Sequence, residues 1–250
     1  MKTAYIIDGY RSAVSKSHKG AFKNMRSDDI AVKVIDHLLK SLPNVDSSLI
    51  DDLIVGCAYP EGEQGMQMAR LISLMSLPIS VPGLTINRFC GSGLEAIAIA
   101  VQRIQSGMAD AIIAGGTESM TMIPQGGYKF SPNPLLAHEH PEYFSNMGIT
   151  AENLVLKYNI SRERQDIFAL SSHKKAYLAL KNRKFEREIV PIEINEVTVD
   201  GENNPYYSHK SIFIDEHIRE NTSLNVLAQL KPSFKKNGSV TAGNSSPLSD

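Results

Sequence analysis

Cys90 is one of two cysteines in the chain, and it lies between an expected strand and an expected helix, a position where a thiol can be reactive. The surrounding sequence, residues 86–100, reads INRFCGSGLEAIAIA. A short apolar run leads to the cysteine, and small and aliphatic residues follow it at helical spacing as far as Gly107. We expect a helix from about Gly91 to Ser106, because the apolar residues repeat every three or four positions and glycine commonly ends a helix.

This position would favour nucleophilic chemistry at Cys90. The unpaired N–H groups and the dipole at a helix amino terminus favour an anion, and the thiolate is the nucleophilic form of cysteine. Gly91 and Gly93 would leave the space above the sulfur open to a substrate. A free cysteine is, however, more often a buried structural residue, and Cys57 within the apolar run IVGCAY fits that description. Position alone leaves both interpretations of Cys90 open.

Other chemistries find weaker support. A serine hydrolase elbow needs Gly-x-Ser-x-Gly, and the residue two before Ser92 is Cys90. The glycines of CGSG and AGGTE lack the spacing of dinucleotide or Walker loops. His138, Glu139 and His140 lie in a Pro-rich segment without the helical spacing of zinc proteases, so we expect solvated loop residues and no metal site.

Composition excludes several classes of protein. The 250 residues are 42% apolar and 21% charged, with 26 Lys and Arg against 27 Asp and Glu. This balance gives no sign of a nucleic-acid partner. No apolar run approaches the roughly 18 residues of a membrane span, and the amino terminus lacks the pattern of a signal peptide. We expect a cytoplasmic protein without disulfides.

The first half of the chain alternates between strand and helix patterns. The expected strands are residues 4–8, 51–59, 84–89 and 109–116, and the expected helices besides that after Cys90 are 28–42 and 65–77. This order predicts an α/β fold with a mostly parallel sheet.

The amino-acid composition changes after Gly116. Residues 121–149 are rich in Pro, Gly, Asn and His and predict a long irregular segment. Helices are expected at 150–159, capped by Thr150, and at 161–182, capped by Ser161. The second helix would carry an apolar stripe of Ile167, Leu170, Ala176, Tyr177 and Leu180. Short strands at 188–194 and 211–215 and a helical turn within 222–232 complete the prediction.

Five motifs together resemble the thiolases, acyl-CoA C-acyltransferases that cleave or form 3-ketoacyl-CoA. They are NRFCGSGLEAI (87–97), GGTESM (115–120), NMGITAEN (146–153), SRERQD (161–166) and VTAGNSSPLSD (240–250). The resemblance runs from Tyr5 to Asp250, and SMTMIPQGGYKFSPNP and PEYFSNMG look most like the degradative enzymes of fatty-acid β-oxidation. It implies a layered αβα core with a mostly parallel sheet over residues 1–118, and an irregular α/β loop domain over 119–250 that binds coenzyme A.

The resemblance also implies roles for single residues. Cys90 matches the nucleophile that carries the acyl group as a thioester. Met147 and Phe234 match contacts with adenine and pantetheine, Arg219 a contact near the charged nucleotide, and Ser246 a pantetheine hydrogen bond. Without the family, core packing of Met147 and Phe234 and a surface ion pair of Arg219 would be the ordinary interpretations. Coenzyme A is then a co-substrate, and no permanently bound cofactor is expected.

The family pattern also has parts that these 250 residues lack. Thiolases continue with a second half carrying Asn-Glu-Ala, Gly-His-Pro and Cys-x-Gly-Gly motifs, and none of the three occurs here. We therefore expect an amino-terminal half, inactive alone, of a protein that is a homodimer or homotetramer when complete. Two alternatives stay open: a non-catalytic CoA-binding or scaffolding module, and a biosynthetic acetoacetyl-CoA thiolase.

Overall fold

The computed structural model describes residues 2–250, which form two compact units. The first unit comprises residues 2–128, 187–216 and 249–250, and the second comprises 129–186 and 217–248. The sequence predicted a boundary at 118, whereas the structure groups 119–128, 187–216 and 249–250 with the first unit. A hydrogen bond joins two of these added segments: the carboxylate of Asp250 accepts the N–H of Thr121 at 2.8 Å.

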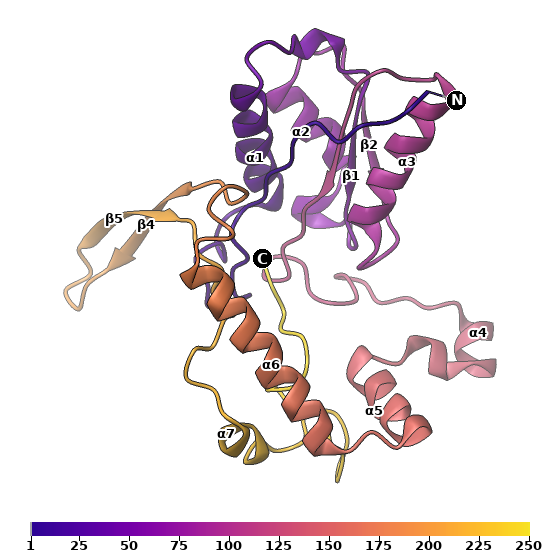
Figure 1. The fold of residues 1–250 in the computed structure, drawn as a ribbon, viewed down its shortest axis with the longest axis vertical. Helices are drawn as coiled ribbons and strands as arrows, with labels where there is room; N and C mark the ends of the chain where they lie inside the picture. Colours follow the sequence, from indigo (N-terminus) through magenta and orange to yellow (C-terminus); the bar gives the residue numbers. More distant parts are fainter. Residues whose placement is uncertain (1) are drawn as a thin grey trace. The chain divides into compact units, whose positions relative to one another are not determined.

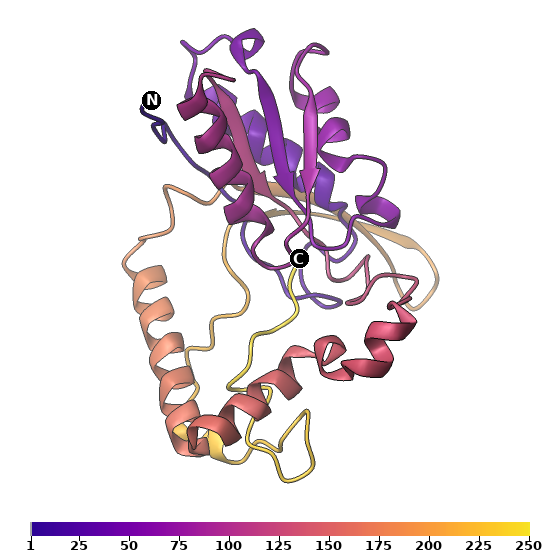
Figure 2. The same ribbon diagram turned by 90° about the vertical axis from the view of Figure 1, so that its right-hand side faces the viewer.

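A three-stranded parallel sheet forms the centre of the first unit. Its strands are β1 (Asp52–Gly56), β2 (Gly83–Ile86) and β3 (Ile112–Gly116), in the order β2-β1-β3. Val55 on the central strand pairs with Thr85 and Gly115. Figure 2 shows the three strands running in the same direction, so their carboxyl ends meet at one edge of the sheet.

Helices cover both faces of this sheet. On one face, α1 (Ser27–Ser41) and α2 (Met68–Ser76) pack over the side chains of Leu53 and Val55. On the other, α3 (Ser92–Ser106) packs over Ile54 (Figure 1). All five residues of β1 are buried because successive strand side chains point to opposite faces and both faces are covered. The predicted layered αβα fold is therefore present. Two short 3-10 turns, Ser47–Leu49 and Gly62–Gln64, lie in the connections.

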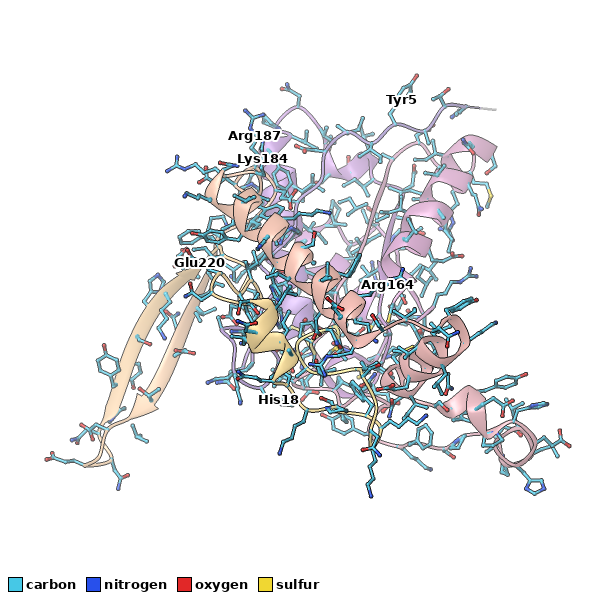
Figure 3. The ribbon with its side chains drawn as sticks, turned by 60° about the horizontal axis from the view of Figure 1, so that its bottom comes forward. Tyr5, His18, Arg164, Lys184, Arg187 and Glu220 are labelled. Carbon is cyan, nitrogen blue, oxygen red and sulfur yellow. The ribbon has the colours of Figure 1, made fainter. Side chains whose placement is uncertain are left out.

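The strand predicted for residues 4–8 does not form. The segment is extended but joins no sheet in the described chain, and Tyr5, Ile6 and Ile7 are 75%, 85% and 74% exposed. Figure 3 shows the Tyr5 side chain standing away from the ribbon. Apolar content suggested a strand, but a strand also needs a hydrogen-bonding neighbour, which these residues do not have here.

A β-hairpin completes the first unit. Strands β4 (Ile192–Val199) and β5 (Pro205–Ile212) are antiparallel and longer than the predicted runs. The turn between them is held by the carboxylate of Asp200, which accepts the N–H groups of Glu202 and Asn204, both at 2.9 Å. An aspartate that bonds to the backbone in this way is typical of turns.

The second unit is helical and irregular. Its helices are α4 (Pro134–Glu139), α5 (Met147–Tyr158), α6 (Arg162–Lys181) and α7 (Leu224–Ala228), with a 3-10 turn at Pro141–Phe144. The segment predicted to be irregular thus contains α4, which Asn133 caps and Pro134 begins. No helix within residues 2–250 is long and apolar enough to cross a membrane.

One predicted helix cap is wrong and one is confirmed. Asn146, rather than Thr150, caps α5 by accepting the N–H of Ile149, so the helix begins one turn earlier than expected. Ser161 does cap α6. Of the predicted apolar stripe of α6, Ile167 is 48% exposed and the other four residues are half-buried, while the buried residue of this helix is Asp166.

Candidate active site

Cys90 lies in the tight connection from β2 to α3. Gly91 is the N-cap, α3 starts at Ser92, and Gly107 ends it with φ 79°, so the predicted helix is confirmed at both ends. The Cys90 side chain is exposed and its thiol is free. Cys90 therefore directly precedes the N-cap of a 15-residue helix.

The backbone before Cys90 is in a sterically strained conformation. Phe89 has φ 46°, in the left-handed region that a bulky side chain rarely adopts. The Oδ1 atom of Asn87 accepts the Phe89 N–H at 2.8 Å. The Ser92 hydroxyl donates to the Phe89 carbonyl at 2.6 Å and accepts the N–H of Arg88 at 2.9 Å. These bonds fix the turn that presents Cys90, and they occupy the Ser92 hydroxyl, which is buried.

Glycines on the sheet allow α3 to approach it closely. A Cβ added at Gly56, the last residue of β1, would lie 2.4 Å from the carbonyl carbon of Ser92. A Cβ at Gly116, the last residue of β3, would lie 3.3 Å from the Cα of Gly93. A Cβ at Gly93 would meet nothing closer than 4.0 Å. The close packing under the nucleophile therefore requires glycine at Gly56 most strictly, a position to which the sequence analysis gave no role.

Cys57 is buried, whereas Cys90 is exposed. Cys57 is 1% exposed, within the cluster formed by Leu53, Val55 and Met68. Burial raises the pKa of the Cys57 thiol to about 12, and the negative charge of Glu118 contributes to the increase. The prediction that Cys57 is a buried structural cysteine is confirmed.

Glu118 and Gln64 organise the loop next to Cys57, and sequence reasoning gave neither of them a role. The carboxylate of Glu118 accepts the N–H of Ala58 at 2.6 Å and an N–H of Gln64 at 2.5 Å. Gln64 is fully buried, and its carbonyl accepts the N–H of Ser119 at 2.6 Å. The available signal was a carboxylate two residues after the glycines that end β3, at the edge of the sheet where the carboxyl ends of the strands meet.

Two of the predicted coenzyme contacts lie side by side in the second unit. Met147 is the first residue of α5 and is 63% exposed. The ring of Phe234 lies against the next residue, Gly148: a Cβ there would be 2.1 Å from the Phe234 ring. Phe234, which is 39% exposed, therefore lies against the first turn of α5, the turn that carries Met147.

Ser246 follows a turn that buried carboxylates hold in place. The Glu152 carboxylate accepts the N–H groups of Ser239 and Val240, both at 2.8 Å. Asp166 accepts the side-chain N–H of Asn244 at 2.9 Å. The motifs NMGITAEN, SRERQD and VTAGNSSPLSD therefore meet in space, although the sequence analysis assigned these carboxylates no role. Ser246 itself is exposed.

Arg219 occupies a different part of the same unit. Its side chain is exposed, and its backbone N–H donates to Nδ1 of His173 on α6 at 3.2 Å. It lines a shallow hollow with Glu220, Asn221, Thr222 and Val226. No hydrogen bond or ion pair found in residues 2–250 links Arg219 to Met147, Phe234 or Ser246.

The histidines near α4 have local partners. His140 lies 3.1 Å from the Glu142 carboxylate and stacks on the ring of Tyr143. His138 and Glu139 are exposed on the last turn of α4. Within the described residues, no three His, Cys, Asp or Glu side chains are grouped as metal ligands.

Comparison with known proteins identifies the family to which the chain belongs. The model of the thiolase amino-terminal domain matches residues 4–250. The chain is 44% identical over its full length to a 3-ketoacyl-CoA thiolase of Bacillus subtilis and 40% identical over 98% of its length to one of Marinomonas. It spans 64% and 61% of those two proteins. The crystal structure of Bacillus anthracis acetyl-CoA acetyltransferase superimposes on all of this chain with a TM-score of 0.84 and 34% identity, covering 64% of that structure. The chain therefore belongs to the thiolase family, as its amino-terminal domain.

Proposed function

We propose that Cys90 is the acyl-carrying nucleophile of a thiolase that cleaves 3-ketoacyl-CoA. The observation that carries this proposal is the exposed thiol on a strained turn at the amino terminus of α3. Membership of the family and the names of the relatives support the reaction class. This chain spans 64% of the length of the Bacillus subtilis relative. The reaction of the whole protein is therefore a proposal.

The proposed reaction has two steps. The Cys90 thiolate attacks the keto carbon of 3-ketoacyl-CoA, the bond between C2 and C3 breaks, and its electron pair leaves with acetyl-CoA as the enolate. A proton added at C2 completes acetyl-CoA. The thiol of a second coenzyme A, after losing its proton, then attacks the Cys90 thioester, and the shortened acyl-CoA leaves as the Cys90 thiolate is restored.

The described residues supply the attack but not the proton transfers. The 250 residues contain no Gly-His-Pro motif and no cysteine after Cys90, the elements to which the family resemblance assigns the base and the acid. Each such group typically contributes about 10² to 10⁴ in rate. We therefore expect the 250-residue polypeptide to be acylated at Cys90 without sustained turnover.

We also propose that the second unit binds coenzyme A as co-substrate. The exposed surface of Met147 and Phe234 suits adenine and pantetheine, and the exposed Ser246 hydroxyl suits a pantetheine amide. Arg219 would contact the phosphates with its exposed guanidinium. A role in fatty-acid breakdown, a cytoplasmic location and a homodimer or homotetramer as the complete assembly are further parts of this proposal.

Intact-mass and peptide mass spectrometry after incubation with acetyl-CoA tests the proposal, because thioester exchange onto Cys90 releases coenzyme A and needs no proton transfer at C2. The expected result is a single acetyl adduct on Cys90, absent in Cys90→Ala and retained in Cys57→Ala. Iodoacetamide in the absence of any CoA compound should label Cys90 first, and Cys57 only after unfolding.

Binding of coenzyme A without any adduct on Cys90 would indicate a binding or scaffolding module instead. Sustained CoA-dependent loss of acetoacetyl-CoA that requires Cys90 would contradict the expected lack of turnover, because another residue of this chain would then have to move the protons.

A further inference from the structure

We propose that Asn87 and Glu118 form a positioning pair for Cys90, joined through the backbone of Ala58. The inference rests on the proposed role of Cys90 as a nucleophile. It assigns a function to two polar side chains that do not carry the acyl group and that come from different segments of the chain.

The first link joins Asn87 to the strained turn. Its Oδ1 atom accepts the N–H of Phe89 at 2.8 Å, and its Nδ2 atom donates to the carbonyl of Ala58 at 2.9 Å. The first bond holds Phe89 at φ 46°, and the second ties the turn to the loop that follows β1. Asn87 therefore fixes the direction of the backbone as it enters Cys90.

The second link joins the same loop to Glu118. The Glu118 carboxylate accepts the N–H of Ala58 at 2.6 Å, so both backbone groups of Ala58 are bonded to side chains. Glu118 is itself held by the amide of the fully buried Gln64 at 2.5 Å. That amide also donates to the carbonyl of Tyr59 at 2.9 Å. Glu118 thus determines where Ala58 lies, and Ala58 determines where Asn87 lies.

The geometry explains why such a pair is needed. A left-handed backbone conformation at a bulky residue such as Phe89 is maintained only where several surrounding interactions hold it. The Phe89 ring is 62% exposed, so its packing, which includes a tilted contact with Tyr59 at 5.9 Å between centroids, gives little restraint. The hydrogen bonds from Asn87 and Ser92 supply the rest. By contrast, the ion pair of Arg88 with Glu95, 3.2 Å long, is on the surface and lies outside this chain of bonds.

Amide hydrogen exchange of residues 87–92 tests the inference without any CoA compound. Glu118→Gln retains the size of the side chain but replaces one carboxylate oxygen with a donor that cannot accept from Ala58 or Gln64. We expect exchange in 87–92 to rise by about tenfold, as in Asn87→Ala, while Glu95→Gln leaves it unchanged. Cys57 should stay protected from iodoacetamide in each variant, which separates a local change from loss of the fold.

Asn87→Asp separates the two links. It keeps the oxygen that accepts from Phe89 but loses the donor to Ala58, so Glu118→Gln should have no further effect on exchange when added to Asn87→Asp. The inference would be overturned if the increases in exchange rate from Asn87→Asp and Glu118→Gln multiplied in the double variant. Unchanged exchange of residues 87–92 in Glu118→Gln would also overturn it.

The rate of acyl transfer to Cys90 is a second measurement that tests the inference. Acetylation of Cys90 by acetyl-CoA should slow by roughly 10- to 100-fold in Asn87→Ala and Glu118→Gln, because small displacements of reacting groups cost rates of this order. Alkylation of Cys90 by iodoacetamide, which approaches from any direction, should change little. An equal loss in both reactions would contradict a positioning role. Absence of acetylation in the unmodified chain would refute the proposed function, and the exchange experiment would still decide the inference.

Discussion

The ring of Phe234 fills the space that a side chain on Gly148 would occupy. A Cβ at Gly148 would stand 2.1 Å from two atoms of the ring, a distance that real contacts do not show. The first turn of α5 and the segment that carries Phe234 therefore form one surface only because residue 148 is glycine.

Gly148→Ala should displace Phe234 and destabilise the protein by about 1–3 kcal/mol, the usual cost of overpacking. Urea unfolding measures the change in stability, and titration with coenzyme A should show weaker binding. Gly201→Ala is the matched control, because a Cβ at Gly201 meets nothing within 4 Å. Unchanged stability in Gly148→Ala would show that Phe234 moves freely and does not belong to a fixed coenzyme surface.

Gly56→Ala should disturb the start of α3. The added Cβ would meet the backbone of Ser92 at 2.4 Å and the N atom of Gly93 at 2.7 Å, and backbone atoms cannot turn away as a side chain can. We expect a loss of about 1–3 kcal/mol in the free energy of unfolding and slower acetylation of Cys90. A Cβ at Gly93 would meet nothing closer than 4.0 Å, so Gly93→Ala should retain the stability of the protein. An equal free energy of unfolding in the two variants would contradict close packing of the start of α3 against the end of β1.

Asp166→Ala should loosen the turn that precedes Ser246. Asp166 is 3% exposed and accepts from Arg162 at 2.8 Å and from Asn244 at 2.9 Å. Removing it leaves two donors without their acceptor, at a cost of about 1–3 kcal/mol. Thermal unfolding and coenzyme A titration should both respond, whereas Glu163→Gln, at an exposed position on the same turn of α6, should not. Unaltered affinity for coenzyme A in Asp166→Ala would separate this turn from binding.

His173 should make the protein less stable in mild acid. Burial, with a contribution from the positive charge of Arg219, lowers the pKa of His173 below its ordinary value of 6.5. Its neutral Nδ1 accepts the N–H of Arg219. Since the unfolded chain takes up this proton first, the stabilisation is present above pH 6.5 and is lost as the pH falls through the folded-state pKa.

Urea unfolding at pH 7 and pH 5 measures this effect. His173→Gln should reduce the difference in unfolding free energy between the two pH values, and His138→Gln, at an exposed position, serves as control. An NMR titration of His173 that gives a pKa above 6.5 would refute the argument.

The sequence by itself determined the local features of this protein. Periodicity and the glycine at 107 located α3, and the position of Cys90 before that helix followed from them. The run IVGCAY marked Cys57 as a core residue, which its 1% exposure confirms. The motifs identified the thiolase family, and alternation of strands with helices predicted the layered α/β fold. Such features depend on residues near one another in the chain, where pattern and propensity act directly.

Tertiary structure alone decided which distant residues meet. Gly56 has a role only because β1 ends beneath Ser92, and Glu118 reaches Asn87 only through Ala58, on a third segment. The carboxylates of Glu152 and Asp166 likewise find their partners more than 70 residues away. The apolar run at residues 4–8 shows the converse, since its pattern predicted a strand that finds no partner in the described chain. Hydrogen bonds and close packing between distant segments depend on the folded path of the backbone, which local sequence patterns do not contain.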